Sequence, residues 1–163
     1  MNRWIRKLAD KHSLDSEKWF DLRLQFSMNC VERTRHLIEN SRAQELYILA
    51  LNYPAGVTRD ELAEAAKECS KIAASHQGNS SNTRLDGSGH AAVSATQGLA
   101  HALHAEAWLA AEYTGYAKVY SYSPHAVTQP AAFAEEYAWQ YKTLQQLLKL
   151  AGITSEAPDF TIT

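Results

Sequence analysis

An alanine-rich segment with almost no charge, residues 87–111, constrains the fold of this chain more than any other feature. Nine of its 25 residues are alanine, and Glu106 is its only formally charged side chain. A helix on the surface of a globular protein normally carries a charged face, whereas small side chains let neighbouring helices approach closely. The segment therefore predicts a helix that lies inside a bundle of other helices.

The remaining sequence also follows the helical period. Apolar residues recur at intervals of three and four, and no segment alternates apolar and polar residues as a half-buried strand would. A length of 163 residues is ordinary for one domain. We therefore expect an all-α fold: one helical bundle, residues 1–163, around the alanine-rich helix.

Capping and helix-breaking residues set the expected boundaries in the first half of the chain. Thr58 and Glu61 form the sequence pattern of a capping box, which satisfies backbone amides at a helix start. Pro54 lies in a segment, 53–56, that ends the preceding helix. The expected helices are a short one with Trp4, Ile5 and Leu8, a second from near Ser16 to about Asn40, a third over 42–52 and a fourth over 59–75.

In the second half, turn-forming residues predict an exposed, mobile loop over 77–89. From about 88 to 120 the sequence predicts one long helix, or two nearly collinear ones broken near Gly98 or Gly115. After a connection over 121–130, Pro130 suits the first position of a last helix that ends at Gly152. Residues 153–163 are expected to form a short tail.

Charge and apolar content restrict the compartment and the partners. The net charge of −2 gives no general attraction to nucleic acid or anionic lipid. The first residues lack the apolar run of a secretory signal, and the least charged stretch is too polar to span a bilayer. Cys30 and Cys69 are expected as buried thiols in a reducing compartment. We expect a cytoplasmic protein without nucleic-acid or membrane partners.

A polar stripe runs along the alanine-rich segment if that segment is one continuous helix. At about 100° per residue, the stripe lies within roughly 60° on one face. It contains His90, Gln97, His101, His104 and Trp108. Such a stripe either hydrogen-bonds across a helix interface or lines a small cleft, or else it holds a metal ion.

A metal site in this stripe would need His101 and His104 together. His90 lies eleven residues before His101, or about 16 Å along the axis at 1.5 Å per residue, too far to share an ion. Further ligands would have to come from another helix, with His36, His76, Glu112 and Glu136 as the candidates. The chain has no HExxH or CxxC spacing. The polar seam is therefore the preferred interpretation, and no cofactor is expected.

Glu106 is a second chemical candidate, because the helical period places it among alanines on the core side. A desolvated carboxylate has a raised pKa and is able to act as an acid or base. Pairing with an arginine, or a place at the edge of the buried region, is the alternative. The chain has no GxSxG, phosphate-binding glycine loop or Cys–His pair of family spacing. A protein that is not an enzyme is therefore expected.

Tyrosines form a further stripe in the last third of the chain. Tyr113, Tyr116 and Tyr120 recur at helical spacing, and Tyr122 follows in the expected connection. Such a stripe is either core or, because tyrosine combines apolar area with a polar group, part of a protein interface. Lys118 is the one basic residue among these rings, whereas a nucleic-acid surface carries many, so nucleic acid is not favoured.

The order of these helices resembles immunity proteins of bacterial polymorphic-toxin systems, the all-helical kind related to immunity family five. The similarity covers about residues 19–150 and rests on His76, 101–103 (His-Ala-Leu), 116–117 (Tyr-Ala), 139–140 (Trp-Gln) and 147–148 (Leu-Leu). Gln97 stands where such proteins often have another histidine, and the 77–89 segment is richer in Ser and Asn than their short joint. The resemblance implies a cytoplasmic protein that neutralises a toxin domain by binding it.

Three functions therefore remain open from the sequence. The first is a toxin-neutralising binding protein that contacts its target through the tyrosines and the 77–89 segment. The second is an inhibitor, encoded by a phage or mobile element, of a host defence complex. The third is a helical metal-dependent enzyme that uses His101 and His104. A homodimer through the aromatic third of the chain is compatible with each.

Overall fold

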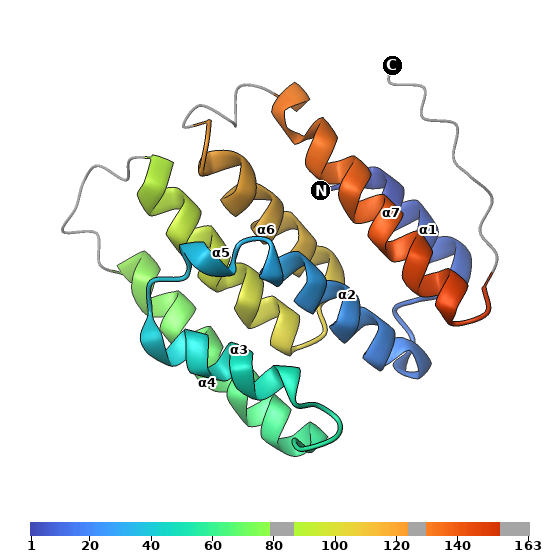
Figure 1. The fold of residues 1–163 in the computed structure, drawn as a ribbon, viewed down its shortest axis with the longest axis horizontal. Helices are drawn as coiled ribbons and strands as arrows, with labels where there is room; N and C mark the ends of the chain where they lie inside the picture. Colours follow the sequence, from blue (N-terminus) through green and yellow to red (C-terminus); the bar gives the residue numbers. More distant parts are fainter. Residues whose placement is uncertain (79–86, 124–129, 154–163) are drawn as a thin grey trace.

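The computed structural model describes residues 1–78, 87–123 and 130–153 of the chain. These ranges form α-helices and short 3₁₀ turns, and no strand occurs among them, so the expected all-α bundle is confirmed (Figure 1). The α-helices are α1 Arg3–His12, α2 Phe20–Glu32, α3 Ser41–Leu51, α4 Arg59–Gly78, α5 Gly87–Leu103, α6 Ala107–Tyr120 and α7 Ala134–Leu150; the 3₁₀ turns are η1 Glu17–Trp19, η2 Arg35–Leu37 and η4 Pro130–Phe133.

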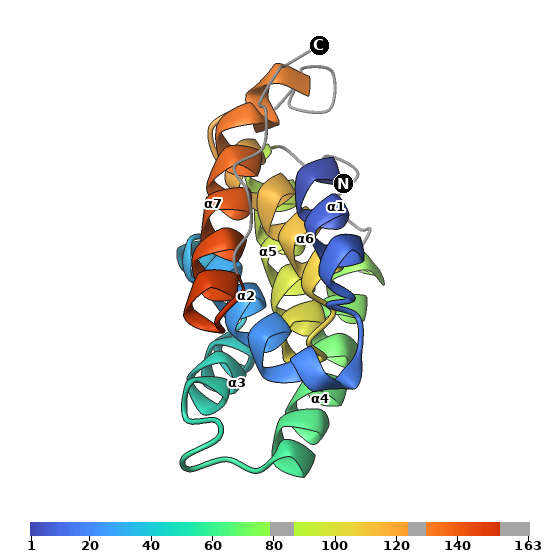
Figure 2. The same ribbon diagram turned by 90° about the vertical axis from the view of Figure 1, so that its right-hand side faces the viewer.

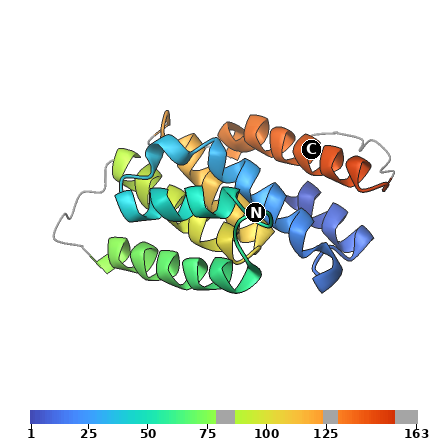
Figure 3. The ribbon, with the colours of Figure 1, turned by 60° about the horizontal axis from the view of Figure 1, so that its bottom comes forward.

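Helices α5 and α6 form the centre of the bundle as an antiparallel hairpin. They pack against each other more extensively than any other pair, and α2 packs across both. Helix α1 packs against α7, and in Figure 2 both helices lie next to the hairpin. Helices α3 and α4 lie at one edge of the molecule, and α1 and α7 lie at the opposite edge (Figure 3). The hairpin therefore keeps one long side that α2 does not cover.

Gly98 allows the close approach of the two central helices. A Cβ atom at this position would lie 2.6 Å from Thr114 Cγ2 and 3.3 Å from the Thr114 backbone nitrogen. A side chain at Gly98 would therefore push α6 away from α5. The sequence offered Gly98 and Gly115 as possible helix breaks. Neither breaks a helix, because Gly98 lies inside α5 and Gly115 lies inside α6.

The break in the alanine-rich segment falls instead at residues 104–106. Ala105 has a φ of 54°, which turns the chain back on itself. Arg23 of α2 holds this turn, because its Nε donates a 3.1 Å hydrogen bond to the Ala105 carbonyl. The prediction of one rod, or of two collinear helices, is therefore wrong. The reason is tertiary: the reversal lets both alanine-rich helices bury their small faces against each other.

Other boundaries differ from the sequence expectation by less. The expected helix from Ser16 to Asn40 is divided into η1, α2 and η2, and the chain is extended at Ile38. Pro130 begins the 3₁₀ turn η4, so the last α-helix begins at Ala134. Gly152 has a φ of 80° just after α7, as the C-terminal glycine signal predicts.

The capping box at the start of α4 is confirmed. The Glu61 backbone N–H donates to Thr58 Oγ1 at 3.2 Å, and the Thr58 N–H donates to Glu61 Oε2 at 2.8 Å. Cys30 and Cys69 are both buried free thiols, as expected. Their separate places in two apolar clusters show that they fill the core.

The predicted mobile loop over 77–89 lies mostly outside the described residues. Its described edges, 77–78 and 87–89, are helical and belong to α4 and α5. Of the predicted tail over 153–163, only Ile153 is described, and it packs partly buried against a core cluster. Within the described ranges, no helix has both the length and the apolar character that crossing a membrane requires.

Candidate functional site

The side of the α5–α6 hairpin that α2 does not cover brings the histidine stripe and the tyrosine stripe together. We call this surface the His–Tyr face, and it consists of His90, Gln97, His101, Glu106, Leu109, Tyr113, Tyr116 and Tyr120. His90, Glu106 and Leu109 are exposed, and the other members are half-buried. The two stripes were separate features of the sequence, and the antiparallel hairpin makes them one surface.

Two ring stacks join the helices across this face. His101 stacks on Tyr113 with ring centroids 5.1 Å apart and an angle of 13° between the planes. His90 stacks on Tyr120 with centroids 5.4 Å apart and an angle of 27°. Stacked rings have little freedom to rotate, so the face offers ordered aromatic area to a ligand or partner.

A hydrogen bond fixes the orientation of the His101 ring. His101 Nδ1 lies 2.6 Å from Glu106 Oε2, and the His101 and Glu106 side chains keep 24% and 49% of their surface exposed. The expectation that Glu106 projects into the core is therefore wrong. The turn at 104–106 takes this residue out of the helical phase that the sequence analysis assumed. A carboxylate on Nδ1 leaves Nε2 of the imidazole for another contact.

The other tyrosines have different surroundings. Tyr116 contacts Phe133 edge to face at 5.4 Å and lies 6.2 Å from the Tyr120 ring, so it links the His–Tyr face to the aromatic cluster of η4 and α7. Tyr122 is 58% exposed, and its hydroxyl donates to the Ala132 carbonyl at 3.3 Å. Tyr122 therefore lies outside the face, in the segment after α6.

Gln97, at the α4 edge of the His–Tyr face, and His104 both contact α4. Gln97 Nε2 donates a 3.2 Å hydrogen bond to the Ala73 carbonyl. His104 Nε2 lies 3.1 Å from Ser70 Oγ. The Ser70 hydroxyl donates to the Ala66 carbonyl at 2.9 Å, so its oxygen accepts the hydrogen bond from His104. This arrangement is the reverse of the one in which a histidine activates a serine nucleophile.

Trp108 does not belong to the polar stripe. It is buried beside Phe26, and its indole Nε1 donates a 2.6 Å hydrogen bond to Asp15 Oδ1. This hydrogen bond is the main cause of a lowered pKa for the Asp15 carboxyl, and the nearby Arg6 guanidinium adds to it. The prediction that placed Trp108 with the histidines is wrong because α5 and α6 are not one continuous helix.

The described residues contain no group of three or more His, Cys, Asp and Glu side chains that could hold a metal ion. Of the co-ligands considered for His101 and His104, Glu112 lies 3.2 Å from the Met1 amino group, and Glu136 is paired with Arg33. His36 lies in η2. The side chain of His76 is outside the described part.

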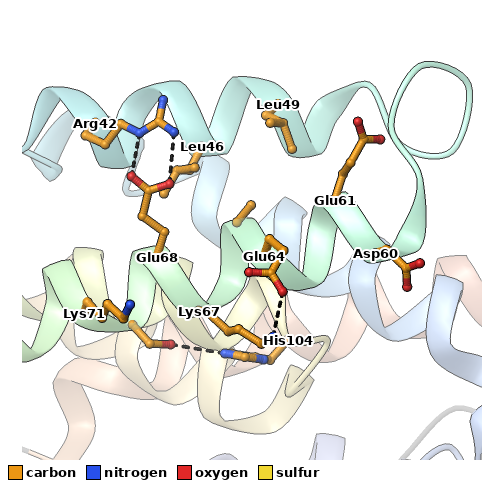
Figure 4. Close-up of a pocket in the computed structure, with 12 residues that line it drawn as sticks. Arg42, Leu46, Leu49, Asp60, Glu61, Glu64, Lys67, Glu68, Lys71 and His104 are labelled. Atoms are coloured by element: carbon orange, nitrogen blue, oxygen red, sulfur yellow. Dashed lines mark hydrogen bonds and ion pairs between the residues drawn. The ribbon is translucent and has the colours of Figure 1, made fainter.

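A hollow of about 910 Å³ lies along α4 between α3 and His104 (Figure 4). Its principal charges neutralise one another: Arg42 forms two hydrogen bonds with Glu68, of 2.7 and 2.9 Å, and Lys67 pairs with Glu64 at 2.6 Å. All of these side chains are substantially exposed. The hollow is therefore a charged, solvated surface, and we do not assign a site to it.

Sequence reasoning missed the residues that shape the end of the face. Arg23 Nη1 donates to the carbonyls of Leu14 at 2.6 Å and Ser16 at 2.7 Å, in addition to its contact with Ala105. Asp15 and Ser70 likewise contact the segment from His104 to Trp108. These residues come from distant parts of the chain, and no local pattern marks them.

No known protein family, curated protein or solved structure matches this chain in a comparison of sequence or of fold. The function must therefore be argued from the residues and their geometry.

Proposed function

We propose that this protein is a binding protein, not an enzyme, and that it inhibits another protein by covering the target's active site or binding surface. The proposed target is a toxin domain in the cytoplasm of a bacterium, as the resemblance to immunity proteins suggests. The proposed contact surface is the His–Tyr face.

The observation that carries this proposal is the pair of stacks on a half-exposed surface, His101 on Tyr113 and His90 on Tyr120. Aromatic side chains that are ordered before binding lose little conformational entropy in a complex. Tyrosines are also enriched among the residues that dominate binding energy at protein interfaces. A stable complex would bury about 800 Å² on each partner, so the contact would extend beyond these rings to neighbouring surface.

The hydrogen bonds of the polar residues support a rigid surface. The Ser70 hydroxyl is committed to a backbone carbonyl, and the His101 ring is held by Glu106. Both arrangements hold side chains in fixed positions, as a rigid recognition surface requires.

Substitution of one exposed residue on the face tests the proposal. Leu109 is 38% exposed on the face, and Ile48 is 44% exposed on α3, so L109R and I48R place the same charged side chain on two different surfaces. We expect the wild-type and I48R proteins, tagged and expressed in the native host, to co-purify with the same toxin domain in equimolar amounts. We expect L109R to lose it.

Thermal unfolding of each variant, followed by circular dichroism, is the control for folding. Equal recovery of the partner by L109R and the wild type would contradict the assignment of the face. Inhibition of the purified partner's activity by the wild type, and its loss in L109R, would separate neutralisation from simple association.

A further inference from the structure

Three aromatic rings among the described residues have both an arginine and a carboxylate close by. The Arg33 guanidinium lies 4.2 Å from the Trp139 ring centroid and pairs with Glu136 at 2.9 Å. The Arg59 guanidinium lies 3.8 Å from the Phe20 ring and pairs with Glu17. A positive charge over a ring is attracted by the negative face of the π-system, and a nearby carboxylate adds to this attraction.

A third group follows the same rule. The Arg35 guanidinium lies 4.8 Å from the Tyr47 ring, and the Tyr47 hydroxyl is hydrogen-bonded to Glu32. Two more cations, Arg3 and Lys18, lie over the rings of Trp4 and Trp19. None of the cation–ring pairs found among the described residues involves the His–Tyr face.

No arginine or lysine lies over the ring stacks of the His–Tyr face in the cation–ring pairs of the described residues. Glu112, beside Tyr113 and Tyr116 on α6, pairs with the Met1 amino group at 3.2 Å. Glu106, at one end of the face, is hydrogen-bonded to the His101 ring and forms no ion pair with a lysine or arginine of the described residues. Burial raises the pKa of Glu136, and Lys118, the lysine of α6, opposes that rise. On the neighbouring helix α4, Lys67 is paired with Glu64.

Two side chains of the face, Gln97 and Glu106, have oxygen atoms free to accept a further hydrogen bond. Gln97 uses its amide nitrogen on the Ala73 carbonyl, which leaves Oε1 to accept a hydrogen bond. Glu106 accepts from His101 through Oε2, and an exposed carboxylate has further lone pairs for a second donor. Rings flanked by acceptors are complementary to a donor that carries positive charge and is flat enough to stack, which describes a guanidinium group.

We propose that the His–Tyr face takes a partner surface that presents arginine side chains, with a guanidinium stacked on the rings and hydrogen-bonded to Glu106. This proposal rests on the proposed function and specifies the chemistry of the target: an arginine-bearing, electropositive protein surface. Binding through it weakens as ionic strength rises.

The test uses a defined probe and a pair of variants of opposite charge. The probe is a capped peptide with four arginines separated by serines, and its control has glutamate in place of each arginine. Binding is followed by NMR of the imidazole C–H signals of His101 and His90, with the exposed His36 in η2 as an internal reference. We expect saturable shifts at His101 and His90 with the arginine peptide alone, and little change at His36.

The variants L109R and L109E change the charge of the face at one exposed position. We expect L109R to weaken binding of the arginine peptide by about tenfold, and L109E to retain or strengthen it. The same exchanges at Ile48, I48R and I48E, are the matched controls and should leave the shifts at His101 and His90 unchanged. Absence of these shifts up to millimolar arginine peptide, or equal shifts with the glutamate peptide, would overturn the inference.

The natural partner separates this inference from the proposed function. If L109R and L109E both lose the toxin domain equally, the face binds it but not through arginine. If neither variant loses the partner, the proposed function of the face itself fails. Loss in L109R with retention in L109E supports both.

Discussion

Trp108 and Asp15 join the start of α6 to the segment between α1 and α2 through a single hydrogen bond of 2.6 Å. The acceptor is a carboxylate and the donor is a buried indole, so this bond belongs to the stronger class of hydrogen bonds with a charged partner. It positions the turn that ends the His–Tyr face.

Replacement of Trp108 by phenylalanine should lower the free energy of unfolding by about 1.5–3 kcal/mol, since a hydrogen bond to a charged group contributes roughly that amount. Urea denaturation measures the difference. A D15N variant keeps an oxygen acceptor for the indole and should lose less. Identical denaturation midpoints for W108F and the wild type would show that this bond does not stabilise the fold.

The same bond predicts a difference in acid sensitivity. The pKa of Asp15 is lowered by the Trp108 hydrogen bond and by Arg6. A carboxylate with a lowered pKa in the folded state stabilises the protein above its unfolded pKa, and this stabilisation is lost as the pH falls through the folded value. Between about pH 5 and pH 2, W108F should therefore lose less stability than the wild type.

Substitution of Gly98 by alanine should destabilise the hairpin by about 1–3 kcal/mol, because overpacking forces neighbouring atoms apart. The added Cβ would meet Thr114 Cγ2 at 2.6 Å. T114S removes that methyl group, so the double variant G98A/T114S should recover part of the loss relative to T114S alone. G56A is the matched control, because its nearest neighbour lies 3.7 Å away. Equal thermal stability of G98A and G56A would argue against the close packing described for α5 and α6.

The buried carboxyl of Glu136 should change the stability with pH in the opposite direction to Asp15. Burial raises the pKa of its carboxyl, although Arg33, Gln140 and Lys118 oppose the rise. A carboxyl with a raised folded pKa keeps its proton longer in the folded state, so the protein loses stability as the pH rises from the unfolded value through the folded one.

The E136Q variant cannot undergo this titration. The stability of the wild type relative to E136Q should therefore fall as the pH rises above about 4.5, the usual value for glutamate. Urea titrations at several pH values measure this slope, and E135Q, at the exposed neighbouring position, is the control. Parallel pH profiles for the wild type and E136Q would contradict the prediction.

Cys30 and Cys69 should resist alkylation in the folded protein. Burial raises the pKa of both thiols, to about 12 for Cys69, and the thiolate is the reactive form. At pH 8, iodoacetamide should modify neither thiol until denaturant unfolds the chain, and then both. Mass spectrometry measures the modification. Rapid labelling of either thiol under native conditions would reveal local opening of that part of the core.

The sequence predicted the features that depend on local pattern. The helical period identified the all-α fold, and the Thr58–Glu61 capping box and Gly152 marked helix ends correctly because these signals act within a few residues. The histidine and tyrosine stripes were each recognisable from spacing alone. The ring stacks could not be predicted, because His101 and Tyr113 meet only after the chain has reversed.

The reversal itself has no local signature. Ala105 adopts a φ of 54° without being glycine or asparagine, and its carbonyl is held by Arg23, 82 residues away in the chain. Assuming a continuous helix instead placed Trp108 and Glu106 on the wrong faces. Gly98 was a candidate helix break in the sequence. Its role is to let α5 approach Thr114 of α6 closely, and only the structure shows this contact.

The three carbonyls that Arg23 binds have a consequence for tolerance to mutation. Leu14, Ser16 and Ala105 each contribute a backbone oxygen to this contact, not a side-chain atom. Most replacements at Ser16 and at other exposed positions of these loops therefore leave the anchor intact. Replacement of Arg23, even by lysine, removes the planar fork that reaches separate stretches of main chain. A single residue of α2, Arg23, thus fixes the geometry of a surface that two other helices form.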